Sequence, residues 1–393
     1  MTQAQLKRQL GFRTAAAVVV GETIAVGIFL TPAGMAKSLG APALVLAVWL
    51  VTGLMALCGA LCYGELAARF PEAGGGYVYL REAYGRPVAF LYGWMAFLVM
   101  DPGIAAALAA GLAGYAGYLL GLSPAGVKLA ALISIISVAA VNVVGVRAGA
   151  RLARWLTALK LALLAALVGW GFASSLGDWS NFAPFAAQRA GSEPLPGALA
   201  GAFVAAFFSF GGWWDASKLA GEVRDPGRTL PRALAAGVLV VTVVYVLTSA
   251  VFIYLVPMEA VTSGETFAAQ AGERLFGSFG ARAFSLVVVV TVLGSLAGLT
   301  MSAPRVYYAM ARDRLFFRAA ARVHARTGTP AVAVALQAAL ACALVLLGSF
   351  DEIVAYFIFV VVVFLALTVA ALFVLRRRAG DGGGTGYRTP GYP

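Results

Sequence analysis

The sequence has few charged residues. They make up 12% of its 393 residues, and the single histidine, His324, lies in a basic stretch. Because no nucleophile, base and orienting group fall together in a pattern typical of catalysis, we do not expect an enzyme. The three cysteines, Cys58, Cys62 and Cys342, show neither disulfide nor metal-ligand spacing. We therefore expect no metal and no other cofactor.

Apolar residues are abundant instead. Hydrophobic residues make up 61% of the chain, and its mean hydropathy is +0.88. Apolar runs of about 20 residues, the length that crosses roughly 30 Å of hydrocarbon, recur along it. Their continuous apolar character favours helices over the alternating strands of a barrel. The sequence thus predicts an all-α membrane protein with ten transmembrane helices, over residues 14–36, 42–68, 87–120, 124–144, 152–175, 197–220, 233–256, 281–311, 330–349 and 352–375.

Basic residues gather in alternate joints between these spans. The segments rich in arginine and lysine are 7–13, 69–86, 147–154, 224–232, 305–326 and 376–388. Lys and Arg are retained on the cytoplasmic side during insertion. We therefore predict a multi-pass protein of the cell membrane with both termini in the cytoplasm. The net charge of +12 then reflects topology, so the lipid bilayer is an expected partner and nucleic acid is not.

The first span contains residues that weaken a helix. Gly21, Gly27 and Gly34 punctuate it, and Pro32 lacks a backbone donor. From this span alone two interpretations are open. Either the helix unwinds near its middle, or the glycines form a face that packs on another helix.

A second interrupted span favours the unwound interpretation. Span 6 carries Gly211 and Gly212 near its centre, within the stretch FFSFGGWWD. Spans 1 and 6 begin two halves of five helices each, and because five is odd, the halves enter the membrane from opposite sides. Paired interrupted helices in inverted halves indicate a transporter site near the bilayer midplane. Freed N–H groups suit a carboxylate and freed carbonyls suit an ammonium, so an amino acid fits both.

Four segments carry a resemblance to a known family. They are IAVGIF in span 1 (24–29), YGELAARFPEAGGGYVYLREAYG after span 2 (63–85), FSFGGWWDASKLAGEVRDPGRTLPRA in span 6 and its joint (208–233), and SAPRVYYAMARDRLFF at the end of span 8 (302–317). In this order they resemble the amino acid/polyamine/organocation transporter superfamily, and within it the L-type amino acid transporters and their bacterial relatives.

The resemblance implies a fold. It is the five-plus-five inverted repeat of LeuT-type transporters, with helices 1 and 6 unwound near the midplane. The first repeat would cover residues 1–175, the second 197–375, and a cytoplasmic tail 376–393. Members of the family usually continue with two further helices.

The resemblance also implies a substrate site at the two breaks. Its predicted residues are Thr23, Ile24, Ala25, Val26, Gly27, Phe208, Ser209, Gly211 and Gly212. The substrate carboxylate would sit on the N–H groups of Val26 and Gly27. The amino group would meet backbone carbonyls near Thr23, Ile24, Phe208 and Gly211.

Two departures from the family pattern bear on this site. Ala25 and Val26 stand where Gly-Ser is usual, which keeps the backbone donors and loses a hydroxyl. Trp214 replaces a smaller polar residue and would reshape the side-chain pocket. Because the glycine pair leaves room beside aromatic walls, we expect a neutral L-amino acid as the substrate.

Two charged residues fall inside spans near the predicted site. Lys160 in span 5 resembles the family's helix-5 lysine, whose ammonium stands where sodium binds in sodium-coupled relatives. It would link helix 5 to the broken part of helix 1 and to helix 8 near Ser295, so sodium dependence is not expected. The other interpretation is a lysine that extends to the cytoplasmic surface. Glu22, near the midplane, is predicted to pair with Lys160, either as a proton site or as a purely structural pair.

Three further ionisable residues lie within spans. Asp101, before Pro102 in span 3, is either a proton or cationic-substrate site, or a carboxylate held by backbone groups freed at the proline. Asp215 and Lys218 are spaced i,i+3 on the cytoplasmic half of span 6, which predicts an ion pair at the inner vestibule.

Together these observations predict sodium-independent secondary transport of neutral L-amino acids by alternating access, as an exchanger or coupled to protons. The alternative is a sensor or subunit that binds an amino acid without completing a transport cycle. A channel fits poorly, because neither a charge ring nor a carbonyl filter motif is present.

Overall fold

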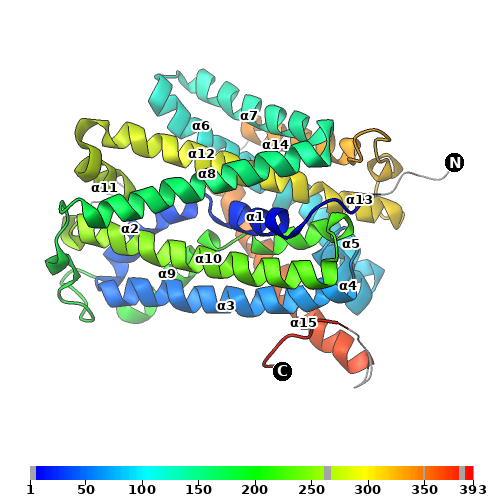
Figure 1. Cartoon of the computed structure of the whole chain (residues 1–393), viewed down its shortest axis with the longest axis horizontal. Helices are drawn as coiled ribbons and strands as arrows, with labels where there is room; N and C mark the ends of the chain where they lie inside the picture. Colours follow the sequence, from blue (N-terminus) through cyan, green and yellow to red (C-terminus); the bar gives the residue numbers. More distant parts are fainter. Residues whose placement is uncertain (1–5, 261–266, 348–349, 380–385, 393) are drawn as a thin grey trace.

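The computed structural model describes residues 6–260, 267–347, 350–379 and 386–392, with the backbone alone for 268–269 and 350–359. Within these ranges the secondary structure is helical, apart from an isolated parallel bridge between Leu10 and Val223. The long helices run side by side along the longest axis, which makes the molecule a helical bundle (Figure 1).

Several helices match single predicted spans. They are α3 (Pro42–Arg69), α7 (Pro124–Val144), α8 (Val146–Ala173), α10 (Pro226–Leu255), α14 (Ala331–Leu347) and α15 (Phe350–Ala379). Among the described residues, eight helical segments are long and apolar enough to cross a membrane, and a bent pair makes a ninth. α14, with 17 residues, is a shorter apolar helix at the place of a further predicted span. The prediction of an all-helical membrane protein is confirmed at this level.

The remaining predicted spans are composite. Span 1 is the pair α1 (Phe12–Thr23) and α2 (Gly27–Leu39), bent by 44°. The others are α5 (Arg86–Met95) with the π-helical turn Ala96–Met100 and α6 (Asp101–Leu120), α9 (Leu195–Ser209) with the 3₁₀ helix Trp213–Glu222, and α12 (Gly280–Ser302) with α13 (Pro304–Arg312). Proline begins the new segment in two of these, because Pro102 and Pro304 lie at the start of α6 and α13, where a missing N–H is tolerated.

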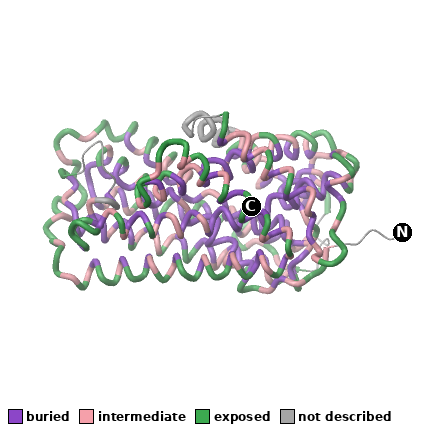
Figure 2. The backbone as a smooth tube through the Cα atoms, turned by 90° about the horizontal axis from the view of Figure 1, so that it is seen from above, coloured by how far each residue is buried: buried purple, intermediate pink, exposed green. Residues whose placement is uncertain are grey.

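Burial follows the bundle geometry. Buried residues line the inside of the molecule and exposed ones its outer surface (Figure 2). In α3, Trp49 and Thr52 face inward, while Leu50 and Leu54 are exposed. Large apolar side chains on the outside are expected where a helix faces lipid rather than water.

Shorter elements close the two ends of the bundle. α4 (Gly76–Tyr84) follows α3, and α11 (Phe267–Phe276) precedes α12 at the opposite end (Figure 1). α15 extends to Ala379, so the helix runs past the predicted start of the tail at residue 376. Of that tail, residues 380–385 and 393 lie outside the described residues. The N–H of Thr389 donates a 2.7 Å hydrogen bond to Glu65, so the described end of the chain packs on α3.

Candidate functional site

The first span is interrupted between α1 and α2. α1 ends at Thr23, Ile24 is extended (φ −76°, ψ 91°), and α2 begins at Gly27. The helical hydrogen-bond ladder stops here. In the described part of the chain, the N–H groups of Val26 and Gly27 therefore have no hydrogen-bond partner. These groups lie at the N-terminus of α2, the positive end of its dipole.

The sixth span is interrupted at the predicted glycine pair. α9 ends at Ser209, and a 3₁₀ helix begins at Trp213. Gly212 between them has a φ of 105°, a conformation that favours glycine. A Cβ on Gly212 would also lie 3.0 Å from the carbonyl oxygen of Glu22. The turn in span 6 therefore packs directly on the broken part of span 1.

A tyrosine from a third helix joins the two breaks. The hydroxyl of Tyr245 in α10 lies 2.8 Å from the carbonyl oxygen of Thr23 and 2.7 Å from that of Ser209. Both carbonyls were freed by the interruptions, and the single hydroxyl proton serves one at a time. The sequence analysis did not identify Tyr245; its signal was a phenol within a largely apolar span that also contains Tyr254.

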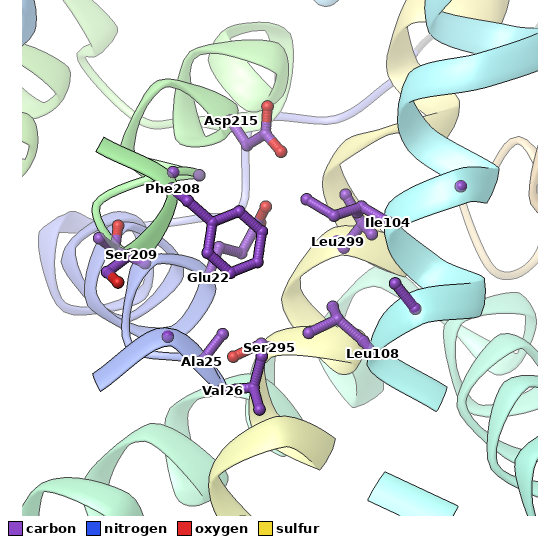
Figure 3. A pocket seen from close by; sticks show the side chains of 16 residues that line it. Glu22, Ala25, Val26, Ile104, Leu108, Phe208, Ser209, Asp215, Ser295 and Leu299 are labelled. Atoms are coloured by element: carbon purple, nitrogen blue, oxygen red, sulfur yellow. The ribbon is translucent and has the colours of Figure 1, made fainter. Parts of the chain in front are cut away.

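A cavity of about 60 Å³ lies between the two breaks (Figure 3). Eight of the nine predicted substrate-site residues line it: Thr23, Ala25, Val26, Gly27, Phe208, Ser209, Gly211 and Gly212. Ile24 does not line the cavity; it is fully buried, and its carbonyl oxygen accepts a hydrogen bond from Lys160. Glu22 and Ser295, predicted as part of the cation site, also line it. The remaining lining residues were not predicted from the sequence: Gly103, Ile104, Ala107 and Leu108 of α6, Leu299 of α12, and Asp215.

Lys160 lies beside the cavity and is fully buried. Its Nζ donates to the carbonyl oxygens of Gly21 at 2.8 Å and Ile24 at 2.7 Å, and to the hydroxyl of Ser295 at 3.1 Å. The ammonium thus joins α8, the broken end of α1, and α12. The interpretation as a surface-reaching lysine is wrong.

Glu22 has a different environment from the predicted one. No ion pair joins it to Lys160 among the described residues; instead its Oε2 accepts a 3.3 Å hydrogen bond from Ser302. The predicted Glu22–Lys160 pair is wrong because Lys160 takes its partners from the freed carbonyls. The side chain of Glu22 packs against Gly298, where a Cβ would lie 2.6 Å from its Cγ.

Asp101 is held by side chains rather than by freed backbone. Its Oδ1 lies 2.9 Å from Lys218 Nζ, and its Oδ2 accepts a 2.9 Å hydrogen bond from Tyr307. Lys218 also pairs with Asp215 at 2.9 Å, which confirms that predicted ion pair. The interpretation in which the proline kink satisfies Asp101 is wrong. Trp214 is buried beside Trp213, with ring centroids 5.4 Å apart, and does not line the cavity.

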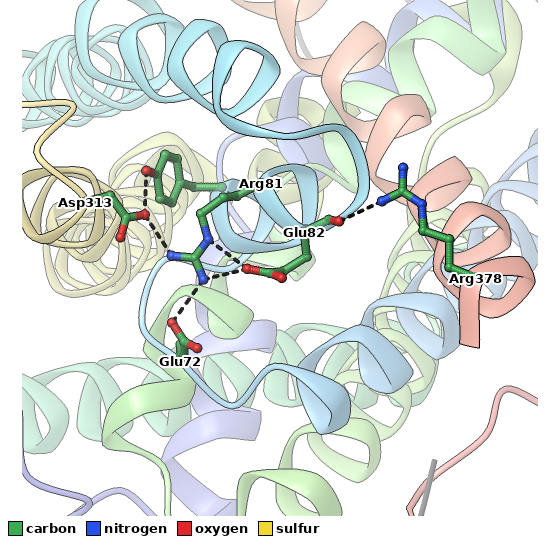
Figure 4. A network of polar contacts seen from close by, with 6 residues as sticks. Glu72, Arg81, Glu82, Asp313 and Arg378 are labelled. Carbon is green, nitrogen blue, oxygen red and sulfur yellow. Dashed lines mark hydrogen bonds and ion pairs between the residues drawn. The ribbon is translucent and has the colours of Figure 1, made fainter. Parts of the chain in front are cut away.

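A second polar network ties the joints at the end of the bundle where α4 and α13 lie (Figure 4). Arg81 of α4 donates to Asp313 at 2.7 Å and to Glu82 at 2.9 Å, and lies 3.3 Å from Glu72. Tyr77 donates to the same Asp313 oxygen at 2.8 Å. Burial, together with this hydrogen bond, raises the pKa of the Tyr77 hydroxyl above its usual range. The network fastens α4 to the residue that follows α13.

Fold and site together define a class of protein: a helical, multi-pass membrane protein with a central cavity between two interrupted spans. The chain belongs to the amino acid permease family, whose model matches residues 10–391.

Curated proteins give the same assignment. The chain is 32% identical over 391 residues to a serine/threonine exchanger, SteT, of Bacillus subtilis (strain 168), which covers 99% of this chain and 87% of that protein. It is 30% identical over 383 residues to the human large neutral amino acids transporter small subunit 2, covering 96% and 71%. It is 28% identical over 377 residues to the mouse b(0,+)-type amino acid transporter 1, covering 94% and 76%.

Proposed function

We propose that this protein is a secondary transporter that carries neutral L-amino acids across the cell membrane by alternating access, without sodium, by exchange or together with protons. The observation that carries the proposal is the pair of unbonded N–H groups of Val26 and Gly27, at a helix N-terminus that opens into a cavity. Such donors bind a carboxylate. The names of the relatives, an exchanger and amino acid transporters, agree with this substrate class.

The substrate amino group would lie toward the end of α9. Phe208 and Gly211 line the cavity there, and Gly211 N–H is bonded to Phe208 O at 3.1 Å, which leaves that carbonyl a second lone pair. The carbonyls of Thr23 and Ile24 already accept bonds from Tyr245 and Lys160, so they are weaker candidates than the sequence predicted. The side-chain pocket would be walled by Ile104, Leu108 and Leu299 in addition to Phe208, an apolar lining that suits an uncharged side chain.

We propose that Lys160 acts as a fixed cation. Its ammonium is buried and bonded to two carbonyl oxygens and a hydroxyl, which are the hard oxygen ligands that a sodium ion would need. An ammonium that already occupies this place removes the need for sodium. This role supports sodium-independent transport.

The proposed architecture is the inverted repeat of residues 1–175 and 197–375, in which α1–α2 and α9 with its 3₁₀ helix are equivalent. Corresponding helices pack on each other, since α3 lies along α10 and α2 contacts α9. Both termini are proposed to be cytoplasmic. In support, basic residues from several joints line one cavity near the N-terminus: Lys7, Arg8, Arg147, Arg151, Arg224 and Arg326.

Uptake by the purified full chain in liposomes tests the proposal. Labelled neutral L-amino acids are offered outside, with or without unlabelled amino acid inside, and with sodium or choline as the cation. We expect saturable uptake whose rate is the same with sodium as with choline. Binding without any flux would instead identify an amino acid sensor, and uptake that requires sodium would contradict the role given to Lys160.

A further inference from the structure

The buried charges of the described residues do not balance. Eight ionisable side chains of the acidic and basic types are buried: Glu22, Glu65, Asp101, Lys160, Asp215, Lys218, Glu222 and Arg305. Glu222 pairs with Arg305 at 2.6 Å, and Glu65 pairs with Arg376 and Arg69. The remainder is three carboxyl groups, Glu22, Asp101 and Asp215, against two lysines, Lys160 and Lys218.

The imbalance is concentrated on Glu22. Asp101 is satisfied by Lys218 and Tyr307. Glu22 is only 7% exposed and lines the cavity, yet its Oε1 has no hydrogen-bond donor. Burying a carboxylate oxygen without a hydrogen-bond donor costs free energy, so we expect this oxygen to have a donor or to carry a proton.

A second carboxyl group lies beside that of Glu22. Asp215 lines the same cavity, three residues after Gly212, where a Cβ would lie 3.3 Å from Glu22 Cβ, and Figure 3 shows the two carboxyl groups directed toward one another. Two carboxylates in contact away from water cannot both be ionised, and the stable arrangement places a proton between them. That proton also brings the five remaining buried charges to neutrality.

The other elements packed on Glu22 do not supply a competing cation. The buried titratable groups on the elements that contact α1 are Asp215, Lys218 and Glu222 of the 3₁₀ helix, Lys160 of α8, and the phenols of Tyr245 and Tyr254 in α10. Lys218 is shared by two aspartates, and Lys160 is bonded to carbonyls of α1. α12 contributes the hydroxyl of Ser302, a neutral donor.

We propose that the carboxyl groups of Glu22 and Asp215 bind a single proton between them, and that this proton crosses the membrane with the amino acid. The inference rests on the proposed transport function and names its coupling ion. When the cavity opens to the side of higher pH, water reaches the pair, the proton leaves to water, and the two carboxylates separate. Glu22 lies on α1 and Asp215 on the 3₁₀ helix, so movement of either broken span alters the pair.

Infrared spectroscopy tests the proton without requiring transport. The purified full chain is titrated over pH, and the carbonyl stretch of a protonated carboxylic acid is recorded for the wild type and for Glu22→Gln and Asp215→Asn. We expect a band that persists at neutral pH in the wild type and is lost in both variants. Glu193→Gln, which alters an exposed acid outside the cavity, is the matched control and keeps the band. A wild type without this band, or variants that retain it, would overturn the proposal.

Proton movement tests the coupling. Liposomes that contain a trapped pH indicator are given labelled amino acid, and acidification of the interior is measured beside the uptake of label. We expect acidification in the wild type and in Glu193→Gln, and its loss in Glu22→Gln and Asp215→Asn. If amino acid enters the wild type with no acidification, the coupling is wrong although the transport function stands. If no amino acid enters at all, the transport function fails, and the infrared band still reports on the proton.

Discussion

Gly27, the first residue of α2, packs on Ser209, the last residue of α9, so closely that a Cβ on Gly27 would lie 2.6 Å from Ser209 Oγ and 2.7 Å from Ser209 Cα. The two interrupted spans thus meet at the point where each loses its helical ladder. The contact is made by backbone, so it fixes where the N–H groups of α2 point.

Gly27→Ala should therefore impair substrate binding. The added methyl group cannot be accommodated by a rotamer change, since one of its neighbours is a backbone atom, and overpacking of this kind costs about 1–3 kcal/mol. We expect substrate affinity to fall about tenfold or more, measured by binding of a labelled neutral L-amino acid to the purified protein. Gly34→Ala in the same helix is the control, because nothing lies within 4 Å of its Cβ position. Equal affinities for the two variants would show that the contact does not position the site.

Lys160→Ala should uncover an empty cation site. The substitution removes the ammonium from the carbonyl oxygens of Gly21 and Ile24 and leaves them the single Ser295 hydroxyl as donor, at a cost of about 1–3 kcal/mol for the carbonyl left unsatisfied. We expect a lower Tm and loss of transport. Sodium, compared with choline, should raise the Tm of this variant and leave that of the wild type unchanged.

Lys128→Ala, at an exposed position of α7, is the control for this variant and should behave as the wild type. A Tm of Lys160→Ala that is insensitive to sodium would contradict the fixed-cation role while leaving a structural role for the lysine.

Features that depend on one residue type in an unusual place could be predicted from the sequence. Gly211 and Gly212 in an apolar span mark the second break. For Lys160 in span 5 the sequence left two interpretations open, and its resemblance to the family's helix-5 lysine favoured the buried one. Apolar run lengths locate the helices, but some ends differ by up to seven residues, since α10 begins at Pro226 and not at the predicted residue 233. These signals are local, so no knowledge of packing was needed to use them.

Contacts between distant segments could not be predicted in the same way. Asp101 and Lys218 are separated by 117 positions, and nothing in either span indicates the other. The Glu22–Lys160 prediction failed because it paired opposite charges and ignored the carbonyls that a broken helix frees. The bridging role of Tyr245 could not be predicted, because a phenol in an apolar helix is equally compatible with a packing role.

Tyr245→Phe should weaken the joint between the two interrupted spans. The ring keeps its edge contacts with Trp49 and Phe210, at centroid distances of 5.0 and 5.1 Å, so only the hydroxyl is lost. One buried hydrogen bond and its unsatisfied acceptor correspond to about 1–3 kcal/mol. We expect a lower Tm and reduced transport. Tyr118→Phe, with a tyrosine that is 61% exposed, should change neither, and a normal Tm for Tyr245→Phe would contradict the bridging role.

The ion pair between Arg81 and Asp313 should stabilise the end of the bundle where α4 and α13 lie. The two side chains are 19% and 22% exposed and their atoms are 2.7 Å apart, so the pair is better shielded than a surface salt bridge. Arg81→Gln and Asp313→Asn should each lower the free energy of unfolding by about 1–2 kcal/mol. Because Arg81 keeps Glu72 and Glu82 as partners when Asp313 is neutral, Asp313→Asn should be the milder change. The double variant should lower the free energy of unfolding by less than the sum of the single variants, by a coupling energy of about 1 kcal/mol.

The control for removing one positive charge from this end is Arg86→Gln, at an exposed position close in sequence. Strictly additive single effects would show that the network in Figure 4 contributes through packing and not through its charges.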